Sequence, residues 1–190
     1  MNKLDLNKLS REAYDSLIEY GLRDDRDTEY QIVNWAREEL SEARKEWERK
    51  EQTPFYYYKG DKLCTDLSDY SGEKPQGVAI EMVDFIWTLL AWFEYTQRVD
   101  LNLYYRLVGL PPYIEDDVNR FERYIDNIAH TISSVNHVTA DEVNATMALK
   151  AGLLYFEHNS LDFFAYLKIK QDYNKNRISR YSSLRDGDRE

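Results

Sequence analysis

Three acidic side chains at helical spacing are the first feature of the sequence that could do chemistry. They are Glu38, Glu39 and Glu42 in the run EELSE, and on a helix they share an arc of about 100°. Like charges three and four residues apart repel each other on a helix, whereas a divalent cation between them would make the same arrangement favourable. Since 35 of the 190 residues are acidic, this run alone also fits a solvated helix face.

A second acidic pair stands in a strongly apolar segment. Glu81 and Asp84 are the only charged residues between positions 78 and 93, and with Thr88 they form one narrow polar stripe on the predicted helix. Burying an isolated carboxylate is costly. We therefore expect the pair to be protonated, to be paired with basic residues from elsewhere in the chain, or to bind a metal ion.

Packing of these two helices against each other would bring four carboxylates together. Glu39 and Glu42 come from one helix, and Glu81 and Asp84 come from the other. An oxygen-only site without histidine suits Mg²⁺ or Mn²⁺ rather than zinc. The excess of negative charge predicts that more than one ion binds, or that ions bind together with a phosphate group.

With these residues the chain resembles the MazG-like nucleoside triphosphate pyrophosphohydrolases of the all-α NTP pyrophosphatase superfamily. The family carries E-E-x-x-E followed by E-x-x-D, as found here at 38–42 and 81–84. The lead-in K-P-x-G at 74–77 and the segment K-x-x-Y-N-x-x-R at 170–177 are also similar to family motifs. The likeness covers residues 28–49, 74–93 and 168–181.

The resemblance implies hydrolysis of an NTP or dNTP between its α- and β-phosphates, which yields a nucleoside monophosphate and pyrophosphate. The four carboxylates would hold Mg²⁺ against the triphosphate, and Glu38 would orient or deprotonate the attacking water. Lys170, Asn174 and Arg177 would reach the phosphates from the other side. The same three residues also fit the solvated end of a helix, where cations are favoured.

Base-binding residues are predicted one to two helical turns before the first acidic motif. Gln31, Asn34 and Trp35 lie there, and their amides and indole suit the edge and the face of a nucleobase. The aromatic run 56–58 could close over the base. Ordinary packing in the core or at the surface explains these residues equally well.

Two stretches depart from the family pattern and leave the substrate open. The gap at residues 50–73 is long, and residues 96–160 have no counterpart in the family motifs. A dUTPase-like enzyme specific for dUTP, from the same superfamily, fits the motifs equally. A non-catalytic helical interaction module is a further alternative. A di-iron carboxylate bundle is disfavoured, because none of the three histidines has Glu or Asp three positions before it.

Helical periodicity dominates the segments that must position these residues, so we predict an all-α fold in a single domain over 1–178. Prolines, glycines and polar stretches separate six predicted helices. These helices cover residues 10–20, 28–49, 78–95, 114–134, 139–158 and 160–176. Residues 50–77 are predicted to form a long loop or insertion, and 179–190 a flexible charged tail.

Charge and hydropathy limit the partners. The net charge is −10 and the basic residues form no stripe, which disfavours binding to duplex nucleic acid. The longest apolar run is shorter than the roughly 20 residues of a membrane span and contains two carboxylates, so no membrane partner is predicted. A single cysteine, Cys64, and N-terminal residues without an apolar run suggest the cytoplasm. A small bundle has difficulty covering the apolar helix at 78–95, so we expect a homodimer or homotetramer.

Overall fold

The computed structural model describes residues 5–19, 29–49, 53–133, 135 and 141–187, with side chains described except at 30, 141 and 177–187. Most of this chain is helical, which confirms the predicted all-α class. Within the described part, no helix combines the length and the apolar character that crossing a membrane would require.

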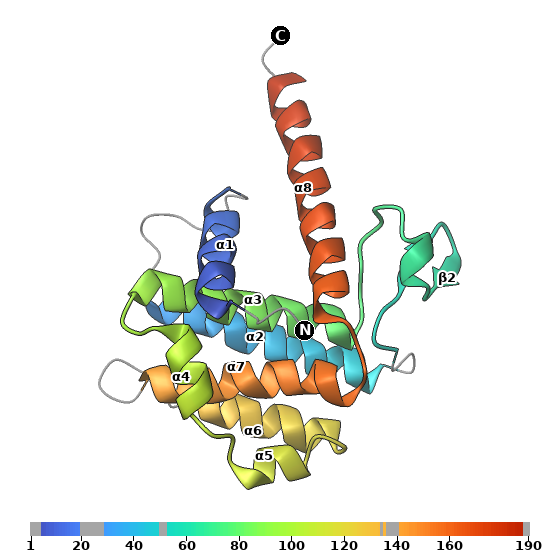
Figure 1. Ribbon diagram of the computed structural model, residues 1–190. Helices are drawn as coiled ribbons and strands as arrows, with labels where there is room; N and C mark the ends of the chain where they lie inside the picture. The colour runs from blue at the N-terminus through green and yellow to red at the C-terminus, as the bar shows by residue number, and fades with distance from the viewer. Residues whose placement is uncertain (1–4, 20–28, 50–52, 134, 136–140, 188–190) are drawn as a thin grey trace.

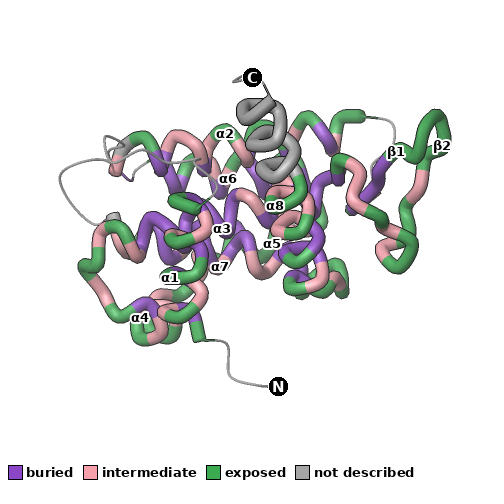
Figure 2. Tube along the Cα trace, turned by 90° about the horizontal axis from the view of Figure 1, so that it is seen from above, coloured by how far each residue is buried: buried purple, intermediate pink, exposed green. Residues whose placement is uncertain are grey.

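Helix α3 (Val78–Thr96) is the centre of the fold. It contacts α1 (Leu6–Glu19), α2 (Glu29–Glu48), α7 (Asp141–His158) and α8 (Phe163–Gly187). Figure 1 shows α2 and α3 running side by side, and Figure 2 shows the buried stretches gathered along α3 and its neighbours. Nearly the whole length of α3 is buried because its sequence is apolar on all sides.

A single chain therefore buries α3 by itself. Every residue from 78 to 93 is buried except Glu81 and Asp84, which are half-buried. This removes the reason for expecting α3 at a subunit interface. The homodimer or homotetramer stays a prediction that the chain's own packing does not require.

The helices predicted for the first half of the chain and for α7 are found close to their expected positions. Helix α2 buries the predicted apolar stripe, including Ile32, Ala36 and Leu40. The start predicted for α7, residue 139, lies outside the described residues. Helix α3 begins after Gly77, whose φ of 111° favours glycine.

The single helix predicted over 114–134 is wrong, because two helices occupy this stretch. These are α5 (Pro112–Asp116) and α6 (Phe121–Ser133). Between them the backbone N–H of Arg120 donates to the carbonyl of Asp117 at 2.7 Å, a three-residue spacing instead of the four of an α-helix. Aspartate and asparagine in this stretch favour such a turn.

Helix α4 (Leu101–Leu107) was not predicted, although its start carries a signal. The Asp100 side chain accepts a hydrogen bond from the backbone N–H of Leu103 and caps the helix.

The segment after α2 is also more ordered than the long loop predicted for 50–77. It contains an antiparallel hairpin of β1 (Tyr57–Lys59) and β2 (Lys62–Cys64), and a short 3₁₀ helix, Leu67–Asp69.

Most of the residues predicted as a flexible charged tail, 179–190, belong to helix α8. Helix α8 continues to Gly187 and extends away from the bundle (Figure 1). It contains no proline, and its only glycine is its last residue, so nothing in the sequence breaks it earlier. The charge that suggested a free tail is equally compatible with a solvated helix.

Candidate metal and phosphate site

Three carboxylates from α2 and α3 converge on one point. Glu39, Glu81 and Asp84 each offer an oxygen within 4.8 Å of the others, and all three side chains are half-buried. Oxygens on opposite sides of one Mg²⁺ lie about 4.2 Å apart, because each Mg–O distance is about 2.1 Å. Small side-chain movements would therefore let the three groups share an ion.

The electrostatics of this cluster favour a cation. Burial, followed by repulsion from Asp84 and Glu81, raises the pKa of Glu39 to about 9. Burial and then Asp84 raise the pKa of Glu81 to about 7. Burial also raises the pKa of Asp84. A divalent ion between these groups would stabilise the ionised forms that burial and mutual repulsion oppose.

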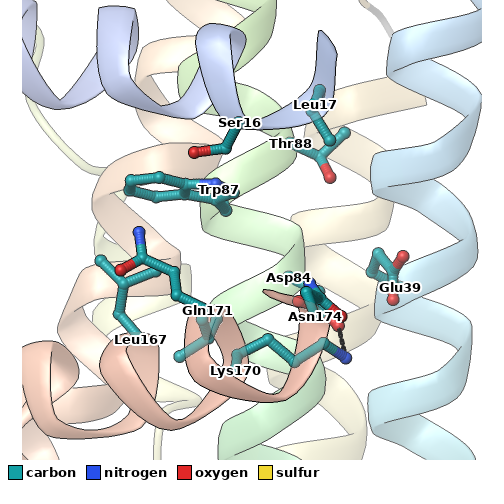
Figure 3. A pocket seen from close by; sticks show the side chains of 11 residues that line it. Ser16, Leu17, Glu39, Asp84, Trp87, Thr88, Leu167, Lys170, Gln171 and Asn174 are labelled. Atoms are coloured by element: carbon teal, nitrogen blue, oxygen red, sulfur yellow. Dashed lines mark ion pairs between the residues drawn. The ribbon is translucent and has the colours of Figure 1, made fainter. Parts of the chain in front are cut away.

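Lys170 on α8 supplies a positive charge to the cluster. Its ammonium group forms an ion pair with Asp84, drawn as a dashed line in Figure 3. Burial alone would lower the pKa of Lys170, but Asp84, Glu81 and Glu39 outweigh burial and raise it above its ordinary value. The lysine is therefore charged, and the basic partner that the sequence left open for Asp84 is present.

The other two acidic residues of the first motif lie further out. Glu42 is exposed, yet its charge contributes to the raised pKa values of Glu39 and Glu81, so it lies nearby. Glu38 is exposed too. Among the described residues, neither belongs to the converging set, and Glu38 does not line the adjoining cavity.

A cavity of about 200 Å³ adjoins the cluster and is lined by residues of four helices. Figure 3 shows the carboxylates at one side of it and the indole of Trp87 at the other. The lining residues come from α1, α2, α3 and α8: Ser16, Leu17, Glu39, Val83, Asp84, Trp87, Thr88, Leu167, Lys170, Gln171 and Asn174. The wall thus combines acidic, basic, amide, hydroxyl and aromatic groups.

Two of the three predicted phosphate-binding residues lie at this cavity. Lys170 and Asn174 both line it, one helical turn apart on α8. The side chain of Arg177, the third residue, lies outside the described residues. A lysine and an amide are suitable donors to phosphate oxygens.

The predicted base-binding residues are not brought to this cavity. Gln31 is exposed, and Trp35 packs against the core. Asn34 accepts a hydrogen bond from Arg37, which also donates to the backbone carbonyl of Ile132 on α6. Among the described residues, none of Gln31, Asn34 and Trp35 lines the wall around Asp84.

Apart from the carboxylates, Lys170 and Asn174, sequence reasoning missed the residues that line the cavity. Thr88 could have been found, because it continues the polar stripe of Glu81 and Asp84 along α3. Ser16 and Gln171 carry no such signal, since α1 and α8 are far from α3 in the sequence and meet it only in the fold. Trp87 lies on α3, but it stands in a run that is apolar on all sides, so the sequence does not mark it as facing a cavity.

A sixth acidic residue, Glu46, was also missed. It is 8% exposed and accepts hydrogen bonds from the hydroxyl of Tyr56 at 2.8 Å and from Arg49 at 2.6 Å. Its spacing of seven residues after Glu39 on α2 was the available signal. For the aromatic run 56–58, the alternative of ordinary core packing applies to Tyr56 and Tyr57, which are buried, whereas Tyr58 is exposed.

Comparisons with family models, with curated proteins and with solved structures find no match for the chain. The resemblance to MazG-like enzymes therefore remains a hypothesis that rests on the sequence motifs. What the site can do is argued below from its geometry and charge.

Proposed function

We propose that the protein hydrolyses a nucleoside triphosphate or deoxynucleoside triphosphate between its α- and β-phosphates in a Mg²⁺-dependent reaction. The observation that carries the proposal is the convergence of Glu39, Glu81 and Asp84 beside a cavity, the wall of which includes Glu39, Asp84 and Lys170. Carboxylates that hold a divalent ion beside a basic group are what a polyphosphate requires.

The carboxylates divide between two helices, which suits a bridging ion. Glu39, Glu81 and Asp84 would ligate Mg²⁺, with Glu42 close enough to complete the shell or to hold a further ion. A bound Mg²⁺ would neutralise phosphate oxygens and lower the pKa of a ligated water. Mn²⁺ offers the same preference for oxygen ligands.

The chain's own donors would orient the phosphates. Lys170 pairs with Asp84 but lines the cavity, so its ammonium group needs only to turn to meet a phosphate oxygen. Asn174 can donate from the same helix one turn later. Glu38 would act on the water only after a change of rotamer, because it is exposed outside the cluster.

The cavity suits the nucleoside part of the substrate. At about 200 Å³ it is smaller than the roughly 300–1,000 Å³ of sites that enclose whole ligands, so it would take one part while the phosphates lie along the carboxylates. The indole of Trp87 offers a surface for a base, and Thr88 and Gln171 offer polar groups to its edge or to the sugar.

Two further candidates use the same residues differently. A dUTPase-like enzyme would use the same metal site and differ only in the choice of base. A non-catalytic helical module is favoured by one observation, the Lys170–Asp84 ion pair, because this pair partly neutralises the cluster without a metal. The module predicts no binding of Mg²⁺ or Mn²⁺. A homodimer or homotetramer is compatible with all three candidates.

A turnover experiment with matched variants tests the proposal. The protein is incubated with Mg²⁺ and each common NTP and dNTP, including dUTP, and both the monophosphate and pyrophosphate are measured. We expect both products from one or a few nucleotides, and their loss in Asp84→Asn. Glu48→Gln, on an exposed position of α2, is the matched control and should keep full activity. Full activity in Asp84→Asn, or no turnover by the wild type with any of these nucleotides, would reject the proposal.

A further inference from the structure

The segment 54–57 touches the three helices that supply the charged residues of the candidate site, α2, α3 and α8. It belongs to the insertion after α2, the stretch in which the sequence departs from the family pattern. Figure 1 shows the insertion at the C-terminal end of α2, beside α8. Three sets of contacts tie it to α2, α3 and α8.

The contact with α2 is made by a side chain. The hydroxyl of Tyr56 donates to Glu46 at 2.8 Å, and Arg49 donates to the other oxygen of Glu46 at 2.6 Å. Tyr56 is 3% exposed, so this hydrogen bond is shielded from water and its loss would leave a buried carboxylate short of a donor. The bond therefore fixes the rotamer of Glu46.

The contact with α3 is made by the backbone. The N–H and carbonyl of Tyr56 both bond to Gln76 at 2.9 Å, and the carbonyl of Pro54 accepts from Ala79 at 2.9 Å. A side chain at Gly77 would come within 2.7 Å of that carbonyl, so glycine is required for the close approach. The segment is thus attached to the first turn of α3, directly before Glu81.

The contact with α8 is aromatic. Phe55 packs edge-on against Tyr166, with ring centroids 6.0 Å apart. Tyr166 precedes Lys170 by four residues, so both lie on the same face of α8. Phe55 also packs against Tyr70 from the same insertion, which holds the ring in place from both sides.

Glu46 lies close to the candidate ligands as well. Its charge contributes to the raised pKa of Glu81, and it follows Glu39 and Glu42 along one face of α2 at a spacing of seven and four. The hydrogen bond from Tyr56 therefore acts on the α2 carboxylate whose charge reaches Glu81, about two helical turns from Glu39.

We infer that Tyr56 is a positioning residue for the metal site: through its hydrogen bond to Glu46 and its backbone bonds to Gln76, it fixes the spacing between the carboxylates of α2 and those of α3. This inference rests on the proposed function, because it assumes that Glu39, Glu81 and Asp84 hold a divalent ion. Tyr56 touches neither the ion nor the substrate, and it acts through Glu46 and the start of α3.

The test is Mn²⁺ binding without nucleotide, measured by titration calorimetry and by the paramagnetic signal of free Mn²⁺. Tyr56→Phe removes one hydroxyl and keeps the ring. We expect its Kd for Mn²⁺ to rise about tenfold, the low end of the effect of changing a residue that orients metal ligands without touching the ion. Tyr58→Phe is the matched control, because Tyr58 is the next-but-one ring, is 44% exposed, and should bind Mn²⁺ as the wild type does.

A purely structural role would give a different pattern. It would lower the melting temperature of Tyr56→Phe and leave the Kd for Mn²⁺ at 25 °C unchanged, and that result overturns the inference. If Tyr56→Phe does not fold, variants of Glu46 test the inference instead. Glu46→Gln keeps an oxygen that can accept the hydrogen bond from Tyr56, so it should bind Mn²⁺ nearly as the wild type does. Glu46→Leu removes the acceptor and should bind Mn²⁺ about tenfold more weakly. Equal binding by both variants overturns the inference. Absence of Mn²⁺ binding by the wild type overturns the proposed function together with it.

Discussion

Lys170 of α8 forms an ion pair with Asp84 of α3, so two helices that are distant in the sequence meet through opposite charges. Both side chains are largely buried, at 19% and 17% exposed. Glu39 and Glu81 raise the pKa of the same lysine. One ammonium group therefore offsets part of the charge of three carboxylates, and it also borders the cavity proposed for the nucleotide.

Replacing Lys170 distinguishes between two interpretations of the cluster, a purely structural ion pair with Asp84 and a metal site. In Lys170→Met the buried carboxylates lose their cation, so the melting temperature of the metal-free protein should fall. The cluster becomes more negative, so Mn²⁺ should bind about tenfold more tightly without nucleotide. Turnover should fall because a phosphate donor is lost. Calorimetry and thermal melts with and without Mg²⁺ check this. If Mg²⁺ does not restore the melting temperature of Lys170→Met, the non-catalytic module is favoured.

Replacing Glu39 should uncouple stability from metal binding. With a pKa of about 9, this side chain is mostly protonated at neutral pH without a cation, so glutamine is a close mimic. Glu39→Gln should keep the melting temperature of the metal-free protein near neutral pH, because one neutral side chain replaces another, and should raise it at higher pH, where ionised Glu39 repels Asp84 and Glu81. It should lose the rise in melting temperature that Mg²⁺ gives the wild type. The control is Glu48→Gln, and a Glu39→Gln protein that Mg²⁺ still stabilises would contradict the assignment.

The fold was predictable from the sequence where periodicity is long. The apolar stripe of α2 and the continuous apolar character of α3 each extend over several turns, and both helices are found as expected. Shorter elements escaped prediction. Strands of three residues, as in β1 and β2, are too short to show alternation. The end of α8 escaped because charge alone does not distinguish a solvated helix from a coil.

Only the parts of the site that depend on the spacing of residues along a single helix were predictable from the sequence. Spacing on a helix fixes which side chains share a face, so the pairing of Glu39 with Glu81 and Asp84 followed from two local patterns. Spacing does not determine which neighbour covers a face. Asn34 lies beside Arg37, which bonds to the end of α6 rather than facing the cavity. Only the fold brings Gln171 to the wall beside α3.

The stability of the metal-free protein should fall as the pH rises. The folded-state pKa of Glu39 is about 9 and that of Glu81 about 7, both above the ordinary value of 4.5. The folded state therefore binds more protons than the unfolded state between about pH 5 and 9, and the stability this gives is lost across that window. Thermal melts from pH 5 to pH 9 check the direction.

Mg²⁺ supplies the control for this pH dependence. A bound cation favours the ionised carboxylates, so saturating Mg²⁺ should flatten or reverse the fall in melting temperature between pH 5 and 9. Glu39→Gln should flatten it without Mg²⁺, because the group with the largest shift is gone. A metal-free wild type whose melting temperature rises steadily across this range would contradict the raised pKa values.

Two sets of residues are candidates for binding the nucleoside, and the kinetics of variants can distinguish them. Thr88 and Gln171 line the cavity beside Asp84, whereas Gln31 is exposed on α2. Thr88→Val keeps the shape and removes a hydroxyl, so KM for the preferred nucleotide should rise about fivefold with kcat little changed, as loss of one hydrogen bond of about 1 kcal/mol predicts. Gln171→Ala should act in the same direction, and Gln31→Ala should leave KM unchanged. If Gln31→Ala raises KM and Thr88→Val has normal kinetics, the base is recognised by residues of α2 and not by the cavity.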